Sequence, residues 1–253
     1  MVKAIGIIPA RYASTRFPGK PLADLGGMTV IERVCRQASK ALSMVAVATD
    51  DERIARAVRA FGGTAVMTSA SHRSGTDRVR EALDILGSDA DVVVNIQGDE
   101  PFIAPEQISA LVGCFDRPDT DIATLARPYD PAMGIDGLAD PNLVKLTMAD
   151  DGRALYFSRS VIPYVRGCEP GEWLSKTRFL THVGIYAYRA DVLRRITGMP
   201  QSSLELAESL EQLRWLQNGL SIRVALTDLP TVGIDTPADL EAARRYLNLN
   251  GNA

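Results

Sequence analysis

The chain has 253 residues, of which 46% are apolar and 23% are charged, and its formal net charge is −3. This composition is typical of a globular protein with a sizeable core, and the lack of a basic excess argues against nucleic acid as a partner. Three widely spaced cysteines and an apolar run near the start that is too short for a signal or membrane segment lead us to expect a cytoplasmic protein with no membrane partner.

Short apolar runs alternate with longer amphipathic segments in the first hundred residues. Taken in chain order, the pattern predicts a strand, a helix, a strand, a helix, a strand, a helix and a strand over residues 4–8, 28–40, 45–48, 51–61, 64–67, 76–86 and 92–96. Asp51 is the expected N-cap of the second helix, and Thr76 is that of the third if the segment before it serves only as a cap. This order predicts an α/β fold with a mainly parallel sheet and helices on both faces.

The second half of the chain is less regular. Strands are predicted over 122–126, 144–148, 181–188 and 222–226, a helical stretch over 204–218 and a closing helix over 238–247. No repeat or linker is evident. We therefore expect one domain over residues 1–253, with a smaller α+β lobe inserted at about 120–190.

The segment after the first predicted strand contains three cations among turn-forming residues. Arg11, Arg16 and Lys20 lie there, together with Ser14 and Gly19. Ligands of open parallel sheets bind beyond the carboxyl ends of the strands, where such a loop can hold a triphosphate. The pattern is neither a Walker A loop nor a Rossmann fingerprint. A solvated basic loop is the alternative interpretation.

Two aspartates follow other predicted strands. Asp99 lies in the segment N-I-Q-G-D-E-P, and Asp235 lies in G-I-D-T-P, where Thr236 and Pro237 begin the closing helix. Carboxylates at neighbouring strand ends can share magnesium over a bound phosphate. Taken alone, each could be an ordinary acidic turn or helix start.

Small and polar residues precede the third predicted helix, in the segment S-H-R-S-G-T-D-R over residues 71–78. Ser74 and Gly75 could receive a base edge or a phosphate at the start of that helix. The alternative interpretation is a capping segment without a ligand.

In this order, these segments resemble those of the 3-deoxy-manno-octulosonate cytidylyltransferases. The resemblance covers nearly the whole chain and includes I-I-P-A-R-Y-A-S-T-R-F-P-G-K-P-L (7–22), V-A-T-D-D (47–51), S-G-T-D-R (74–78), N-I-Q-G-D-E-P (95–101), A-L-Y-F-S-R (154–159), H-V-G-I-Y-A-Y-R (182–189), L-E-x-x-E-S-L-E-Q-L-R (204–214) and G-I-D-T-P-A-D-L-E (233–241). It implies a Rossmann-like nucleotidyltransferase domain that transfers CMP from CTP to 3-deoxy-manno-octulosonate (Kdo) for lipopolysaccharide biosynthesis. It also implies a homodimer, formed through the 120–190 lobe.

The resemblance implies roles for three groups of residues. CTP would be bound by Arg11, Ser14, Arg16, Lys20, Ser74, Arg78 and Asp99. Mg²⁺ would be bound by Asp99 and Asp235, and these two together with Arg11 and Lys20 are the predicted catalytic residues. The sugar acid would be bound by Gln97, Arg159, His182, Tyr186, Glu205, Glu211 and Gln212. From spacing alone, the last three could instead form the polar face of a helix, and His182 could be an ordinary packed histidine.

Three alternative functions stay open at this point. The chain could transfer CMP to another sugar acid, such as a sialic-acid-like substrate, or bind nucleotides on the same fold without catalysis. A sugar-1-phosphate nucleotidyltransferase is less favoured because its G-x-G-T-R loop is absent. The sequence also has Met28 where the resemblance leads us to expect a lysine, at the start of the first predicted helix.

Overall fold

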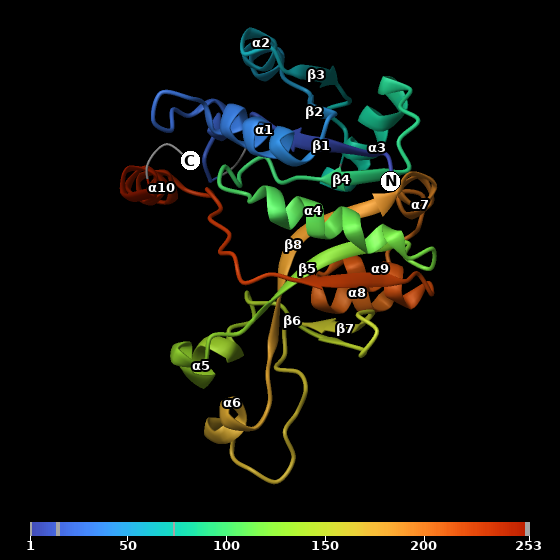
Figure 1. The fold of residues 1–253 in the computed structure, drawn as a ribbon, viewed down its shortest axis with the longest axis vertical. Helices are drawn as coiled ribbons and strands as arrows, with labels where there is room; N and C mark the ends of the chain where they lie inside the picture. The colour runs from blue at the N-terminus through green and yellow to red at the C-terminus, as the bar shows by residue number, and fades with distance from the viewer. Residues whose placement is uncertain (1, 14–15, 73, 251–253) are drawn as a thin grey trace. The chain divides into compact units, whose positions relative to one another are not determined.

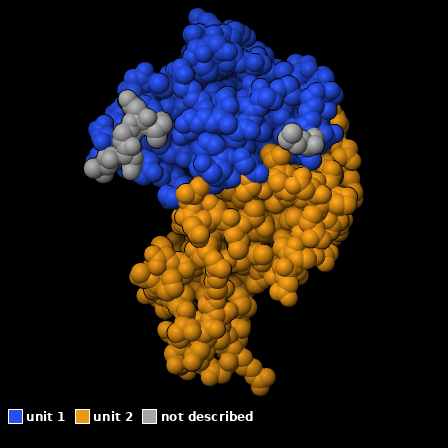
Figure 2. All heavy atoms as spheres, viewed as in Figure 1, with its two compact units in different colours: residues 1–109, 230–253 blue, residues 110–229 orange. Residues whose placement is uncertain are grey.

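The computed structural model describes residues 2–13, 16–72 and 74–250. The chain forms two compact units, one of Met1–Ser109 with Pro230–Ala253 and the other of Ala110–Leu229 (Figure 2). The second unit is therefore an insertion into the first. It begins earlier and ends later than the lobe predicted at about 120–190.

Unit 1 is built on a parallel sheet in the strand order β3-β2-β1-β4 (Figure 1). Its strands are β1 (Ala4–Ala10), β2 (Val45–Thr49), β3 (Thr64–Met67) and β4 (Val92–Asn95). Consecutive residues of β1 and β4 are buried, so both faces of the central strands are covered, as the run of apolar residues in each requires. The predicted α/β fold is confirmed, and all four strands lie within two residues of their predicted bounds.

Several helices of unit 1 begin at side-chain caps. The helices of this unit are η1 (Lys20–Leu22), α1 (Val30–Ala41), α2 (Glu52–Ala60), α3 (Gly75–Leu86) and α10 (Pro237–Asn250), while α4 (Pro105–Gly113) contains the boundary between the units. Thr29 caps α1 and Asp51 caps α2 by accepting backbone N–H groups. The cap predicted for α3 was wrong: Ser74, not Thr76, accepts the N–H of Asp77.

A small apolar cluster holds the two ends of unit 1 together. Leu25 and Val30, at the start of α1, pack with Ile234, Leu240 and Ala243 around the start of α10. All five side chains are buried. This packing connects the segment before α1 to the segment that carries Asp235.

Unit 2 contains a mixed arrangement of strands. They are β5 (Ile122–Pro128), β6 (Lys145–Met148), β7 (Ala154–Ser158), β8 (Leu180–Arg189) and β9 (Ile222–Leu226). β5 pairs antiparallel with β8 and parallel with β9, and β6 pairs antiparallel with β7 and β8. Its helical segments are η2 (Cys114–Asp116), η3 (Pro131–Met133), α5 (Gly134–Ala139), η4 (Pro170–Glu172), α6 (Trp173–Lys176), α7 (Ala190–Ile196), α8 (Ser203–Glu208) and α9 (Glu211–Gln217).

The helical stretch predicted over 204–218 is divided into two helices. Ser209, between α8 and α9, has a φ of 51° and so adopts the left-handed conformation that ends a helix. Ser202 caps α8 in a capping box with Glu205. The apolar periodicity was read correctly, but it does not reveal this break.

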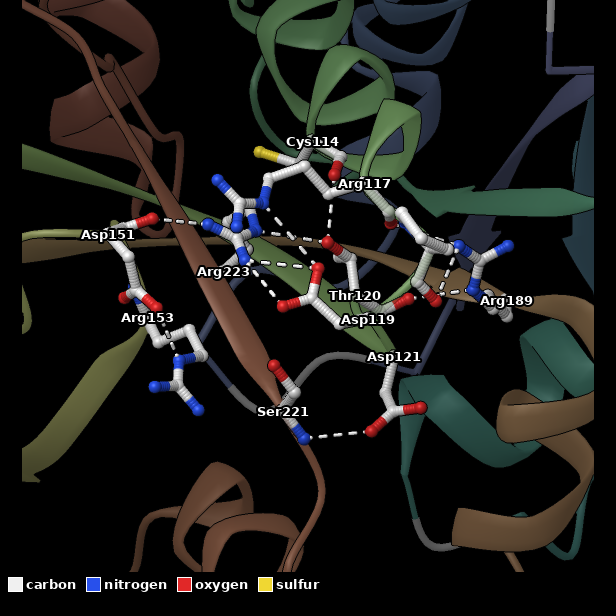
Figure 3. Close-up of polar contacts among 11 residues, drawn as sticks. Cys114, Arg117, Asp119, Thr120, Asp121, Asp151, Arg153, Arg189, Ser221 and Arg223 are labelled. Atoms are coloured by element: carbon white, nitrogen blue, oxygen red, sulfur yellow. Dashed lines mark hydrogen bonds and ion pairs between the residues drawn. The ribbon is translucent and has the colours of Figure 1, made fainter.

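A buried arginine on β9 connects three segments of unit 2 (Figure 3). Arg223 Nε donates to Thr120 Oγ1 at 3.0 Å, its Nη2 lies 3.2 Å from Asp119 Oδ2, and its Nη1 donates to the carbonyl of Asp151. Arg189 adds a bond from Nε to the Thr120 carbonyl at 2.7 Å. Both guanidinium groups thus satisfy backbone and side-chain acceptors of the turn before β5.

Within the described part of the chain, no helix combines the length and the apolar character needed to cross a membrane.

Candidate active site

Lys20 contacts two carboxylates beyond the carboxyl end of the unit 1 sheet. Its Nζ lies 2.6 Å from Asp99 Oδ2 and 3.3 Å from Asp235 Oδ1, and its side chain is only 12% exposed. The side chain of Asp99 is 31% exposed and that of Asp235 is 48% exposed. The two aspartates that the sequence analysis grouped are therefore brought together around one cation.

Backbone contacts hold these aspartates in place. The N–H of Ile234 donates to the carbonyl of Asp99 at 2.9 Å, so the segment before α10 runs beside the loop after β4. Asp239 Oδ2 accepts the N–H groups of Asp235 at 3.0 Å and Thr236 at 2.8 Å. The Thr236 hydroxyl, followed by these N–H groups, lowers the pKa of the Asp239 carboxyl.

Gly98 allows the loop after β4 to approach β1. A Cβ atom at this position would lie 2.7 Å from the carbonyl oxygen of Pro9, a separation that backbone atoms do not tolerate. Only glycine fits without a shift of the backbone. The residue before Asp99 thus sets how close this aspartate comes to the strand that leads to Lys20.

The other predicted cations of the first loop have different partners. Arg16 Nη2 lies 3.1 Å from Asp235 Oδ1, so Arg16 joins the cluster around Lys20, although its side chain is largely exposed. Arg11 instead donates to the carbonyl of His72. Ser14 lies outside the described residues.

Glu100 is a candidate that the sequence analysis missed. Its Oε2 is buried, with no hydrogen-bond partner among the described residues. Burial, together with the neighbouring Asp99, raises the pKa of the Glu100 carboxyl to about 7. In the sequence, its position next to Asp99 could have pointed to Glu100 as a site residue.

The segment before α3 has a structural role. The Oγ atom of Ser74 accepts the N–H of Asp77 at 3.1 Å, which uses this hydroxyl oxygen as a cap. Arg78 is fully buried, with Nη1 2.6 Å from Thr68 Oγ1 and Nη2 2.9 Å from Asp50 Oδ2. Arg78 therefore has no exposed surface for the predicted contact with a nucleotide, and its geometry favours support of the loop after β2.

The predicted sugar-binding residues are divided between the units. Gln97 follows β4 in unit 1, and the other six belong to unit 2. Their surroundings within unit 2 separate them into an aromatic group on β8 and a charged group on α8 and α9.

The aromatic group contains His182 and Tyr186 on one face of β8. The His182 ring lies 5.2 Å from that of Phe157 and 5.3 Å from that of Tyr186, and its Nε2 is 3.0 Å from Thr124 Oγ1. Burial lowers the pKa of the His182 imidazole to about 4. The ring is thus neutral near pH 7.

Helix α9 adds buried polar atoms beside this aromatic group. Trp215 packs edge-on against Tyr186 and Tyr188, with ring centroids 5.1 and 5.6 Å apart. Trp215 Nε1 and Gln212 Nε2 are buried and have no hydrogen-bond partner among the described residues. Because positions 212 and 215 share a helix face, two unsatisfied donors lie near each other, which is the pattern expected where a polar ligand binds. The sequence analysis missed Trp215.

The charged group is organised by an arginine that the sequence analysis also missed. Arg214 Nε lies 3.2 Å from Glu205 Oε2, and its Nη2 lies 2.6 Å from Glu211 Oε1. Arg159, at the end of β7, donates from Nε to the carbonyl of Glu208 at 2.6 Å. Both predicted glutamates and Arg159 therefore have protein partners within unit 2.

The donor set around Lys20 fits a hard divalent cation. Two carboxylates supply oxygen ligands of the kind that magnesium prefers, and magnesium commonly completes its shell with substrate phosphates and water. The described residues contain no group of three or more His, Cys, Asp or Glu side chains arranged to hold a metal. A magnesium site here would therefore depend on the substrate for its remaining ligands.

Comparison with known proteins extends these observations. The cytidylyltransferase family model matches residues 5–222. A 3-deoxy-manno-octulosonate cytidylyltransferase of Parabacteroides distasonis is 57% identical over 98% of this chain and 99% of its own length. One of Thermodesulfovibrio yellowstonii is 47% identical, covering 96% of this chain and 98% of its own.

Similar solved structures agree with these sequence comparisons. A CMP:2-keto-3-deoxy-manno-octonic acid synthetase complexed with CTP has a TM-score of 0.89 and 44% identity, over 98% of this chain and all of that one. A cytidylyltransferase from Leptospira borgpetersenii has a TM-score of 0.65 at 14% identity, covering 100% of this chain and 89% of that one. The second likeness concerns the fold alone.

Proposed function

We infer the function of this chain from its family: it belongs to the cytidylyltransferases, and it carries out the reaction of the 3-deoxy-manno-octulosonate cytidylyltransferases. CMP is transferred from CTP to Kdo, which gives CMP-Kdo and pyrophosphate for lipopolysaccharide assembly. We propose that this reaction takes place in the cytoplasm, and cell fractionation tests that location.

One observation carries the assignment of the catalytic residues: Asp99 and Asp235 meet at the ammonium group of Lys20. The hydroxyl oxygen at the anomeric carbon of Kdo attacks the α-phosphorus of CTP and loses its proton to solvent, and the bond from phosphorus to the pyrophosphate oxygen breaks. Such a transfer needs positioning and charge neutralisation more than covalent chemistry by the protein. Lys20, Arg16 and Arg11 would neutralise the triphosphate and the leaving pyrophosphate.

Asp99 and Asp235 would hold Mg²⁺, which neutralises phosphate charge and lowers the pKa of the attacking hydroxyl. Their partial exposure supports this role, since both carboxylates can reach a ligand without a change of fold. Lys20 keeps the pair compensated by a positive charge in the free protein.

The sugar acid would be bound by residues of unit 2. The buried, unsatisfied donors Gln212 Nε2 and Trp215 Nε1 support this assignment, because a polyhydroxylated acid supplies the acceptors that they lack. Arg214 orients Glu205 and Glu211.

Pyrophosphate release from CTP, Kdo and Mg²⁺ tests this function directly. A panel with sialic-acid-like acceptors distinguishes Kdo from another sugar acid, and CTP binding without release would support a non-catalytic protein. Asp99→Asn and Asp235→Asn should each lower turnover at least about a hundredfold, the effect of losing a key electrostatic group. Asp89→Asn, at an exposed residue paired with Lys3, is the matched control. Near-normal turnover in both test variants would contradict the metal assignment.

We further propose that the chain forms a homodimer through unit 2. Large apolar side chains are exposed there, including Met133, Leu155 and Tyr164, the last at 73%. Tyr164 packs edge-on against the buried Trp173, with 5.0 Å between ring centroids, which holds the exposed tyrosine ring in place. Light scattering coupled to size exclusion measures the mass; a monomer at micromolar concentration would oppose this proposal.

A further inference from the structure

Tyr12 connects the cationic loop to a neighbouring helix. Its ring lies directly under the guanidinium of Arg53, with Cζ 3.3 Å from the ring centroid. The same ring lies so close to Gly19 that a Cβ atom there would be 3.1 Å from it, and the N–H of Gly19 donates to the Tyr12 carbonyl at 2.9 Å. Gly19 has a φ of +73°, a conformation that favours glycine, and a Cβ atom there would also crowd the Tyr12 ring.

Arg53 is held in a fixed orientation even though its side chain is 52% exposed. Its Nε donates to Asp51 Oδ1 at 2.9 Å, and its Nη2 donates to Asp51 Oδ2 at 2.6 Å. Asp51 is in turn fixed, because it caps α2. This two-point contact keeps the guanidinium plane available to the aromatic ring, which a lysine ammonium cannot do.

The connected residues lie beside the catalytic cluster in the sequence. Tyr12 follows Arg11, and Gly19 directly precedes Lys20, whose ammonium contacts Asp99 and Asp235. Fixing Tyr12 and Gly19 against α2 therefore fixes where the Lys20 backbone begins.

We propose that Arg53 is a positioning residue for CTP: clamped by Asp51 and stacked on Tyr12, it holds Tyr12 and Gly19, and with them Lys20, in the arrangement that receives the triphosphate. This inference rests on the proposed role of Lys20 at the triphosphate. Arg53 acts through Tyr12 and not by its own charge on the nucleotide.

Steady-state kinetics of Arg53→Ala test the proposal. The KM for CTP should rise about three- to fivefold, as expected for an exposed cation–π contact, while the KM for Kdo should change less than twofold. Arg56→Ala is the matched control, because it removes the same charge from an exposed position of the same helix. Arg53→Lys keeps the charge and should not restore the KM for CTP. Full restoration by Arg53→Lys, or an equal effect of Arg56→Ala, would show that charge alone matters and overturn the proposal.

A double-mutant cycle with Tyr12→Leu tests the route of the effect. Each single variant should raise the KM for CTP by a similar factor, and the double variant should be no worse than either, because both remove one interaction. Multiplying effects would mean that Arg53 acts independently of Tyr12, against the proposal. Lys20→Ala in the same assay distinguishes failure of the proposed triphosphate site from failure of the proposed role of Arg53. If Lys20→Ala leaves the KM for CTP unchanged, the triphosphate site itself is wrong. If Lys20→Ala raises the KM for CTP but Arg53→Ala does not, only the role of Arg53 is wrong.

A measurement on the free protein complements the kinetics. Trypsin can cut after Arg16, and Lys20 is protected by the following proline. Cleavage after Arg16 should be about three- to fivefold faster in Arg53→Ala than in Arg56→Ala, because the open population of the segment increases by that factor. Equal cleavage rates in two folded variants would overturn the proposed clamp.

Discussion

The buried imidazole of His182 leads to a quantitative prediction. On β8, the ring packs between Phe157 and Tyr186, and burial lowers its pKa to about 4 from an ordinary value near 6.5. Thr124 contacts the ring nitrogen with a hydroxyl, which carries no charge to offset protonation. We therefore expect His182 to stay neutral across the pH range in which the enzyme works.

The sign of the effect on stability follows from proton binding. When the pH falls below about 6.5, the unfolded chain takes up a proton at this position and the folded chain does not, so acid favours unfolding. From the two pKa values, the loss in unfolding free energy is about 2 kcal/mol between pH 7 and pH 5, and about 3 kcal/mol by pH 4. Above pH 7 the contribution vanishes.

The chain is well suited to the measurement, because it contains only two histidines. In an NMR titration of the imidazole Cε1–H signals, the resonance that disappears in His182→Gln belongs to His182, and it should stay unshifted down to about pH 5. Urea unfolding of wild type and His182→Gln at pH 7 and pH 5 should differ in pH dependence by about 2 kcal/mol. A His182 midpoint near 6.5, or identical pH dependence of the two proteins, would refute the reasoning.

Two further predictions concern backbone approach and buried charge. Gly98→Ala should lower the unfolding free energy by about 1–3 kcal/mol and reduce turnover, because the added Cβ meets the Pro9 carbonyl. Gly113→Ala is the control, because a Cβ there would have no atom within 4 Å. Equal urea midpoints of the two variants would contradict the close approach at Gly98. Arg223→Met should lower the unfolding free energy by about 2 kcal/mol, because it leaves buried acceptors unsatisfied. Arg153→Met, which removes a largely exposed ion pair, should lower it by less than about 0.5 kcal/mol. Matching urea unfolding curves of the two variants would contradict the structural role of Arg223.

Local pattern was sufficient where a single physical rule decides the structure. The bounds of β3 and the N-cap at Asp51 were predicted as they are found. In S-G-T, by contrast, two hydroxyls compete for one cap, and composition does not distinguish Ser74 from Thr76. Helices α4 and α7 were not predicted at all. In α4, Pro105 occupies the first helical turn, where proline is well accommodated.

The candidate site shows the same difference between features that local pattern predicts and features that tertiary contacts decide. Asp99 and Asp235 could be grouped because each was placed after a predicted strand, and strand ends of a parallel sheet meet at one edge. In the structure Asp99 does follow β4, whereas Asp235 lies well beyond β9, in the segment before α10. The partners of an arginine, however, depend on tertiary contacts. The sequence around Arg78 does not predict its burial against Asp50. The sequence likewise does not predict that Arg214 forms ion pairs with both Glu205 and Glu211.

We propose that the position of Lys20 also connects the binding of the nucleotide to that of the divalent cation. Its ammonium neutralises the carboxylates that would hold magnesium, and Arg16 contacts Asp235 as well. A triphosphate attracts both cations and so leaves Asp99 and Asp235 with uncompensated charge, which favours a divalent ion at that moment. Without the triphosphate, the same carboxylates are already paired, so a cation must compete with Lys20. Because coupling between two ligands is reciprocal, we expect magnesium and CTP each to bind more tightly in the presence of the other.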